Sequence, residues 1–228
     1  HEAKCLPDEI AIQGQGTLKT LTEFFPKLGV RIIPSFKSAY VWDFDYKYDI
    51  KKNIVLIALP ISIDISKEII TKIHDAKITL KLDNKNSPFI IKPHPTHDVK
   101  VIKEIVQKID LEMRVTYEKS FPKLLNTTSV LLTEASSTCL EALSCGIPVI
   151  VVINTSGLSY SPLPSGLPNK IYYNAETSND IVLALKLFLY RDTLMFEELN
   201  IIGQKIRNDF FEPITQKGMN KFLKKNIN

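Results

Sequence analysis

Two short polar segments follow apolar runs of the sequence and carry residue types suited to binding an anion. The first is Lys92-Pro93-His94-Pro95, directly after the run Phe89 to Ile91. Prolines restrict the backbone, so this segment holds a cation and an imidazole in fixed places. Such a pair suits an anionic ligand such as a diphosphate.

The second segment is a cluster of hydroxyl side chains, Ser136, Ser137 and Thr138, between the apolar run Val130 to Leu132 and a helical pattern. Unpaired amides and the positive end of a helix dipole favour a phosphate at such a turn. Glu141 comes about one turn into the helix, within reach of a hydroxylated group such as a ribose. The alternatives are that the hydroxyls only cap the helix and that Glu141 is a solvated helix residue.

The histidines and glycines near these segments also allow plainer interpretations. His94 alone would suit a strand-end histidine bonded to backbone, but the flanking prolines and Lys92 favour a phosphate contact. His97 is predicted to be a surface residue at a helix start. Gly14-Gln15-Gly16 is interpreted as a turn, because a dinucleotide fingerprint would need a third glycine and a downstream acid.

From Asn53 onward, short β-branched runs alternate with stretches of helical period, which is typical of parallel βαβ units. This pattern predicts an α/β fold with a doubly wound, Rossmann-like parallel sheet and C-terminal helices, whose ligand lies outside the carboxyl ends of the strands. The predicted strands are 54–59, 89–91, 113–117, 130–132 and 149–153, with an edge strand at 171–173. The predicted helices are 64–78, 98–109, 121–125, 138–144, 178–190 and 193–210.

The first part of the sequence is less regular. It contains two predicted strands, 10–12 and 31–34, and one predicted helix, 18–25. We interpret residues 1–52 as a connector from an N-terminal domain that the sequence lacks, and residues 53–228 as the Rossmann-like domain. The long segment 154–169 is either a substrate lid or a tolerated surface loop.

The composition predicts a globular protein rather than a disordered or fibrous one. The chain has 228 residues, of which 44% are hydrophobic and 24% charged, and a formal net charge of +4. Its lysines are spread along the chain without interleaved aromatics, which argues against nucleic acid. The basic tail Lys221 to Lys225 suits a solvated helix end better than a peripheral contact with an anionic membrane, but both remain open.

The cysteines and the start of the sequence bear on location. Three cysteines leave one unpaired and lack metal-ligand spacing, so we expect a reducing cytoplasm and no metal site. The sequence begins without Met, without a leader and without an apolar run long enough to span a bilayer. We therefore expect a soluble piece of a longer protein.

Both segments together resemble a known family. The run Thr133 to Val151 resembles the donor-site segment of GT-B glycosyltransferases, in which hydroxyl residues contact the donor phosphate and a helical Glu contacts ribose. Lys92 to Pro95 resembles the His-Pro motif of bacterial sialyltransferases, capsule-export-linked transferases and CDP-glycerol glycerophosphotransferases. Those families pair it with a Ser-Ser or Ser-Thr motif, as at Ser136-Ser137, here about forty residues further on.

The resemblance implies the donor-binding half of a bacterial surface-carbohydrate transferase. It assigns Lys92, His94, Ser136, Ser137 and Thr138 to the donor phosphates and Glu141 to the ribose. The implied reaction is an inverting transfer of a sugar or glycerophosphate to a polysaccharide or lipid-linked acceptor, without metal or further cofactor. CMP- and CDP-linked donors are slightly favoured over UDP-linked ones.

The sequence departs from the family in its acids. The general base of sialyltransferase-like enzymes comes from the N-terminal domain, so no catalytic residue is assigned here. Glu134 and Glu141 are one residue too close for the glutamate pair of some retaining transferases, and Glu134 receives no catalytic role. Two alternatives stay open, a nucleotide-sugar epimerase of the same fold and a non-catalytic nucleotide-sugar-binding subunit that needs a partner.

Overall fold

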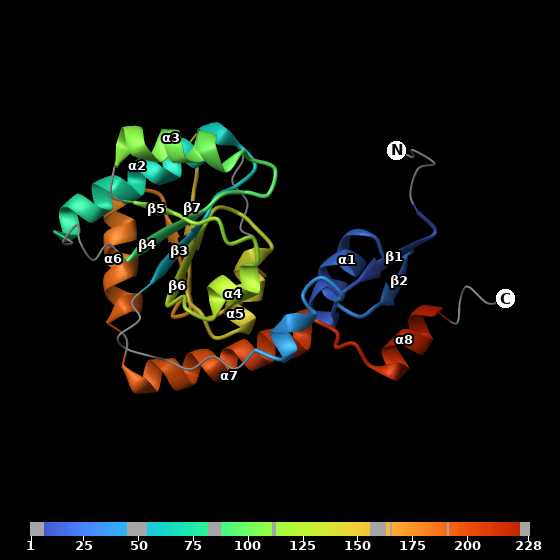
Figure 1. The fold of residues 1–228 in the computed structure, drawn as a ribbon. Coiled ribbons are helices and arrows are strands. Elements are labelled where there is room, and N and C mark those ends of the chain that lie inside the picture. The colour runs from blue at the N-terminus through green and yellow to red at the C-terminus, as the bar shows by residue number, and fades with distance from the viewer. Residues whose placement is uncertain are drawn as a thin grey trace.

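The computed structural model contains two parallel sheets of unequal size (Figure 1). It describes residues 7–44, 54–81, 88–110, 113–155, 163–164, 166–190 and 192–223. The larger sheet has the strand order β5-β4-β3-β6-β7-β8, and every neighbouring pair is parallel. This is the strand order of a doubly wound Rossmann sheet, which confirms the predicted fold class.

The six strands coincide with the predicted apolar runs to within a few residues. They are β3 (Val55–Ala58), β4 (Phe89–Lys92), β5 (Arg114–Val115), β6 (Val130–Thr133), β7 (Val149–Val152) and β8 (Tyr172–Ala175). The central strands β6 and β7 are buried at every position, as expected for a parallel sheet that is covered on both faces. The predicted edge strand near 171–173 is β8, which does lie at the edge.

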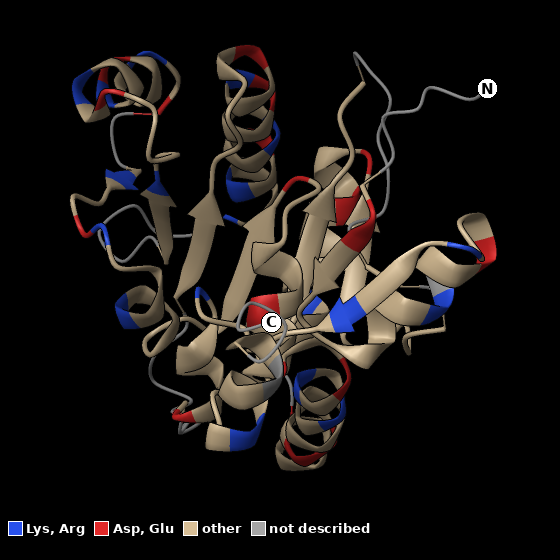
Figure 2. Cartoon of the chain, turned by 90° about the vertical axis from the view of Figure 1, so that its right-hand side faces the viewer, with Lys and Arg blue, Asp and Glu red and all other residues tan. Residues whose placement is uncertain are grey.

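Helices cover both faces of this sheet (Figure 1). One face carries α2 (Ile63–Leu80), α3 (Val99–Ile109) and α6 (Ser178–Leu189), and the other carries α4 (Phe121–Leu125), α5 (Thr138–Ser144) and α7 (Thr193–Phe210). Each layer encloses its own cluster of buried apolar side chains. Only Lys92 and Arg114 bring charge into the large sheet, and Figure 2 shows the other charged residues of this part on helices and loops.

Side-chain caps and one glycine set the ends of these helices. Ser62, Asp98, Thr177 and Asp192 each accept a backbone N–H in the first turn of a long helix. Gly146 has a φ of +75° just after α5, a left-handed conformation that glycine adopts readily at the end of a helix. None of the described helices is both long and apolar enough to cross a bilayer.

The smaller sheet pairs β1 (Glu9–Ile12) with β2 (Gly29–Ile32), and α1 (Leu18–Phe24) connects them. The strands and the helix predicted before residue 53 are thus present and form a βαβ unit. A one-turn helix, η1 (Gln15–Thr17), precedes α1, and a second, η2 (Ala39–Trp42), follows β2 on the way to the large sheet. That residues 1–52 connect to a further domain stays a prediction.

The C-terminal helices join the two sheets. Helix α7 runs from the large sheet to the small one, and α8 (Gln216–Leu223) lies beside the small sheet (Figure 1). There Arg31 donates a hydrogen bond to the Phe222 carbonyl. A Cβ on Gly14 would lie 2.5 Å from the Asp209 carbonyl oxygen at the end of α7. This glycine therefore serves a tight packing contact, in line with the turn interpretation.

The crossing of α5 and α7 depends on Gly203. A Cβ at this position would lie 2.7 Å from the Leu143 carbonyl oxygen and 3.0 Å from the Gly146 nitrogen. Both are backbone atoms that cannot rotate away. We expect Gly203→Ala to lower the free energy of unfolding by about 1–3 kcal/mol, the usual cost of overpacking, in a urea titration.

Ile201→Ala provides the control for this substitution, because Ile201 lies on the same helix and is 68% exposed. Its expected change is within about 0.5 kcal/mol. Equal stability of Gly203→Ala and the wild type would show that the two helices have room to separate.

Candidate functional site

A cavity of about 580 Å³ lies at the carboxyl ends of β3, β4 and β6. The chain reverses its direction of winding between β3 and β6, and this is the place where open α/β sheets bind ligands. The volume is within the range of small-molecule sites. The cavity is lined by residues of strand ends, of the loops near them and of α4 and α5, namely Lys37, Ala58 to Ile61, Lys92 to Pro95, Lys119, Phe121, Thr133 to Thr138 and Glu141. All six sequence-predicted site residues are among them.

Strand register explains why the two predicted segments meet. Ala58 at the end of β3 pairs with Lys92 on one side and with Thr133 on the other. The segments that follow Lys92 and Thr133 therefore leave the sheet at the same level, separated by one strand. The Thr133 hydroxyl donates to the Ala58 carbonyl at 2.8 Å, which fixes the second of these exits.

Lys92 is the cation nearest the sheet in this cavity. It is half-buried at the end of β4, and burial lowers the pKa of its ammonium group. The negative charge of Glu118 acts in the opposite direction and raises this pKa. Lys92 donates a long hydrogen bond, 3.5 Å, to the Pro93 carbonyl, so most of its donor capacity remains for a ligand.

His94 presents one nitrogen to its own loop. Its Nδ1 accepts the Thr96 backbone N–H at 3.3 Å and lies 2.7 Å from the Thr96 hydroxyl. The ring proton of the neutral form must then be on Nε2. Burial, and then the charges of His97 and Lys92, lower the His94 pKa, so the ring is a neutral donor at pH 7. The backbone-bonded interpretation thus holds for Nδ1, and the phosphate contact through Nε2 stays a prediction.

His97 does not have the predicted surface position. It is half-buried, and its Nε2 donates to the Ile61 carbonyl at 2.8 Å, which ties the loop after β4 to the loop after β3. Within the described part of the chain, its buried Nδ1 has no hydrogen-bond partner. The His94 and His97 rings meet edge to face, with centroids 5.8 Å apart. His97 therefore supports the loop that carries His94.

The three hydroxyls before α5 divide into two roles. Ser136 Oγ accepts from the Thr138 N–H at 3.3 Å and from the Thr138 hydroxyl at 2.9 Å, so Ser136 is occupied in the turn. Ser137 is the residue before the helix but makes no side-chain cap bond. The capping interpretation thus fits Ser136, whereas the Ser137 hydroxyl lines the cavity without serving the helix end.

Glu141 is buried rather than solvated. Its exposed fraction is 5%, and its Oε2 accepts the Tyr40 hydroxyl at 2.6 Å. Burial, followed by the Glu141 charge, raises the pKa of Tyr40 well above its usual range, so the phenol stays protonated and remains a donor. A carboxylate buried at a cavity wall needs such a partner, because leaving it unpaired is costly.

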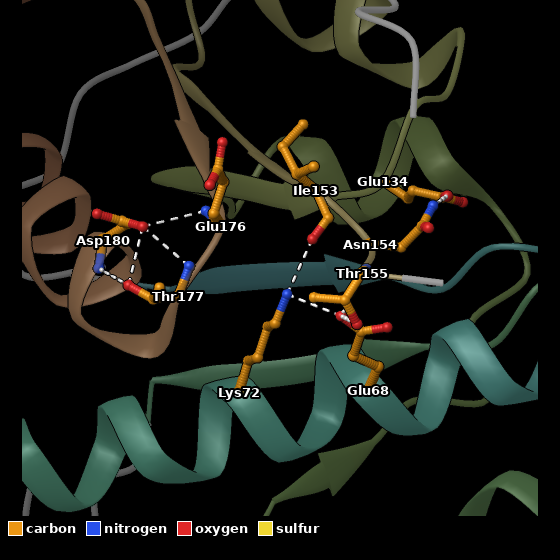
Figure 3. Close-up of polar contacts among 9 residues, drawn as sticks. All are labelled: Glu68, Lys72, Glu134, Ile153, Asn154, Thr155, Glu176, Thr177 and Asp180. Carbon is orange, nitrogen blue, oxygen red and sulfur yellow. Dashed lines mark hydrogen bonds and ion pairs between the residues drawn. The ribbon is translucent and has the colours of Figure 1, made fainter. Parts of the chain in front are cut away.

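Glu134, which also lines the cavity, is held by a hydrogen bond. Its Oε1 accepts from Asn154 Nδ2 at 2.6 Å, as Figure 3 shows. Asn154 opens the segment 154–169 that follows β7, and its neighbour Thr155 donates twice to Glu68 of α2 at 3.1 Å. Most of the following residues, 156–162 and 165, lie outside the described residues, so the choice between lid and surface loop stays open.

Three residues of the site escaped the sequence analysis. Lys37 and Lys119 line the cavity. Together with Lys92 and His94 they give it three lysine side chains and one imidazole, compared with two carboxylates, those of Glu134 and Glu141. Lys119 follows a predicted strand, so the rule that found Lys92 could have found it. Lys37 and Tyr40 lie in an irregular segment that carries no such signal.

A second cavity of about 320 Å³ adjoins the first. It lies between the two sheets. Its walls include Ile12 and Gln13 at the end of β1, Phe210 and Phe211 at the end of α7, and residues of α5. Lys37, Ser137 and Glu141 line both cavities. The first cavity thus continues into a cleft at the end of the small sheet.

The described residues contain no group of three His, Cys, Asp or Glu side chains placed to hold a metal ion. Cys139 and Cys145 are buried free thiols, and burial raises the pKa of each to about 12. Thiols that remain protonated at neutral pH are poor nucleophiles, so these cysteines serve the packing of α5.

Comparison with known proteins relates the chain to others through its structure. Neither a protein-family model nor a curated protein matches the sequence. Among solved structures, TarM of S. aureus, in complex with Fondaparinux, α-GlcNAc-glycerol and UDP, has a TM-score of 0.57 and 14% identity over 95% of this chain and 43% of TarM. HepE of Anabaena, in complex with UDP and glucose, has a TM-score of 0.53 and 15% identity over 98% of this chain and 65% of HepE.

A third similar structure is a Listeria monocytogenes protein assigned as a UDP-N-acetylglucosamine 2-epimerase, with a TM-score of 0.56 and 13% identity over 87% of this chain and 54% of that one. The chain thus spans about half the length of such structures. At these identities the similarity defines the fold and not the activity. The chain has the Rossmann-like fold that GT-B glycosyltransferases and this epimerase share.

Proposed function

We propose that this chain binds a nucleotide-activated sugar and forms the donor-binding half of a GT-B-type glycosyltransferase. The observation that carries the proposal is the single cavity in which Lys92, His94, Ser137 and Glu141 meet at the carboxyl edge of the sheet. A cation, a neutral imidazole donor and a free hydroxyl suit the oxygens of a diphosphate. A buried carboxylate beside them suits a ribose hydroxyl.

In this proposal the phosphate contacts also assist the reaction. Negative charge grows on the leaving nucleotide phosphate as the bond to the sugar breaks. Lys92 and the Nε2–H of His94 stabilise that charge, and the lowered His94 pKa keeps the ring neutral at pH 7, so His94 acts by hydrogen bonding rather than as a charge. Ser137 adds a further donor to the same group.

The acceptor and the rest of the enzyme belong to the same proposal. The second cavity, which shares Lys37, Ser137 and Glu141 with the first, offers an acceptor a place next to the donor. A general base comes from a further domain attached on the side of the small sheet. A surface polysaccharide or a lipid-linked glycan is the proposed acceptor, and cytidine donors are slightly favoured over uridine donors.

An epimerase is the second candidate, because the similar Listeria monocytogenes structure carries that assignment. The two functions differ in their need for an acceptor. Conversion of a UDP-sugar to its epimer by the protein alone, observed by NMR, would favour the epimerase and contradict the transferase.

The proposal is tested by calorimetric titration of the chain with CMP, CDP, UMP and UDP. We expect a diphosphate to bind more tightly than its monophosphate, because more phosphate oxygens reach the cations. His94→Ala is expected to weaken that binding about tenfold to one hundredfold, the loss typical of one hydrogen bond to a charged group.

His74→Ala serves as the histidine control, because His74 lies on α2, contacts Asp110 after α3 and does not line the cavity. It is expected to bind each nucleotide as the wild type does. Absence of binding for all four nucleotides would refute the proposed function.

A further inference from the structure

We propose that Tyr40 is a positioning residue for the nucleotide, which acts by holding Glu141 in the orientation that selects a ribose over a deoxyribose. This inference rests on the proposed function and extends it to a residue that is 101 positions from Glu141 in the sequence. Tyr40 does not line the first cavity itself, whereas Glu141 does. Its effect on a ligand must therefore pass through the carboxylate.

The geometry leaves Glu141 one oxygen for a ligand. Tyr40 donates to Oε2 at 2.6 Å, a short hydrogen bond to a charged acceptor. No described protein group donates to Oε1. With Oε2 occupied, the carboxylate cannot rotate without losing this bond, so Oε1 is the oxygen that Glu141 can offer to a ligand in the cavity it lines. Glu141 then accepts one hydroxyl of the ligand in a fixed direction.

Tyr40 itself is held on a rigid support. Val41, the next residue in η2, has no exposed surface and belongs to the hydrophobic cluster that contains α5. Trp42 lies under the Arg207 guanidinium, 6.0 Å from ring centroid to Cζ, and Arg207 donates to the Ser144 carbonyl at 2.9 Å. The turn that carries Tyr40 is therefore fixed to the helix that carries Glu141.

This arrangement links the ligand site to the segment between the two sheets. Lys37, three residues before Tyr40, lines both cavities. The same short segment thus supplies a cation to the cavity and a hydrogen bond to its buried carboxylate. A displacement of this segment would change both contacts at once. Ribose selection therefore requires that the segment from Lys37 to Tyr40 is correctly placed.

The test compares Tyr40→Phe with the wild type in calorimetric titrations of CDP, 2′-deoxy-CDP, UDP and 2′-deoxy-UDP. Phenylalanine keeps the ring and removes only the hydroxyl. We expect ribonucleotide affinity to fall about fivefold to tenfold, less than the roughly tenfold to one hundredfold loss of a hydrogen bond to a charged group because Glu141 itself remains, with little change for the deoxynucleotide. The ratio of ribo to deoxy affinity therefore shrinks, which a merely structural role would not produce.

Tyr172→Phe is the matched control, since the Tyr172 hydroxyl donates to Asn169 outside the cavity. It is expected to leave the ratio unchanged. A ratio in Tyr40→Phe equal to that of the wild type, or equal weakening of both ligands, would overturn this inference alone. If neither CDP nor UDP binds the wild-type chain, the inference fails together with the proposed function.

Discussion

Replacing Lys92 with methionine is expected to weaken nucleoside diphosphate binding by about tenfold to one hundredfold, the range for a hydrogen bond to a charged group. Methionine keeps the length of the side chain and removes the charge. Because Lys92 is half-buried, water screens its attraction to a phosphate less than it would at the surface. Isothermal calorimetry with CDP and UDP measures the effect directly.

The matched control for this substitution is Lys170→Met. Lys170 pairs with Glu198 on the surface, and its side chain is 67% exposed. It is expected to bind nucleotides as the wild type does. A Lys92→Met protein with wild-type affinity would show that the cation in the cavity does not contact the phosphates.

The pH dependence of binding offers a further check on Lys92. Burial lowers its pKa, so the ammonium group loses its proton at a lower pH than an ordinary lysine. The charged form is present below that pKa, and affinity should therefore fall as the pH rises through it. In Lys92→Met this part of the decline should disappear, while any decline due to other groups remains.

Replacing Asp110 with alanine is expected to lower the free energy of unfolding by about 3–5 kcal/mol, the usual cost of breaking a buried ion pair. The Asp110 carboxylate accepts from Lys77 Nζ at 2.8 and 3.1 Å, and both side chains are only 5% exposed. His74 Nδ1 lies 3.2 Å from the same carboxylate. Removal of the Asp110 carboxylate takes away the negative charge that faces the buried Lys77 ammonium group.

Asp64→Ala is the control for this effect, because Asp64 also pairs with a lysine on α2 but is 91% exposed. Its expected cost is at most about 1 kcal/mol. The double substitution Lys77→Met and Asp110→Leu should recover part of the loss, since it removes both charges. Equal costs for Asp110→Ala and Asp64→Ala in urea titrations would show that burial adds nothing to the ion pair.

Local patterns of residue types predicted those parts of the structure that local backbone preference decides. Continuous β-branched runs such as Val149 to Val152 predicted buried strands, and the helical pattern over 138–144 predicted α5. The carboxyl-end rule then brought Lys92, His94 and the hydroxyl cluster to one cavity, because parallel strands in register end at the same edge of the sheet. These features follow from residue types and their spacing along the chain.

Other features depend on contacts between distant parts of the chain. Tyr40 and Glu141 are 101 residues apart, and no local pattern pairs them. The burial of Glu141, the contribution of Lys37 and the half-buried position of His97 likewise arise from how loops pack on one another. The alternation of strands and helices in the sequence determined the sheet and the location of its ligand edge, since both follow from local backbone preference and hydrophobic period. Only the tertiary structure decided which side chains close the cavity and which oxygen of Glu141 remains for a ligand, because packing between segments of no regular period sets those contacts.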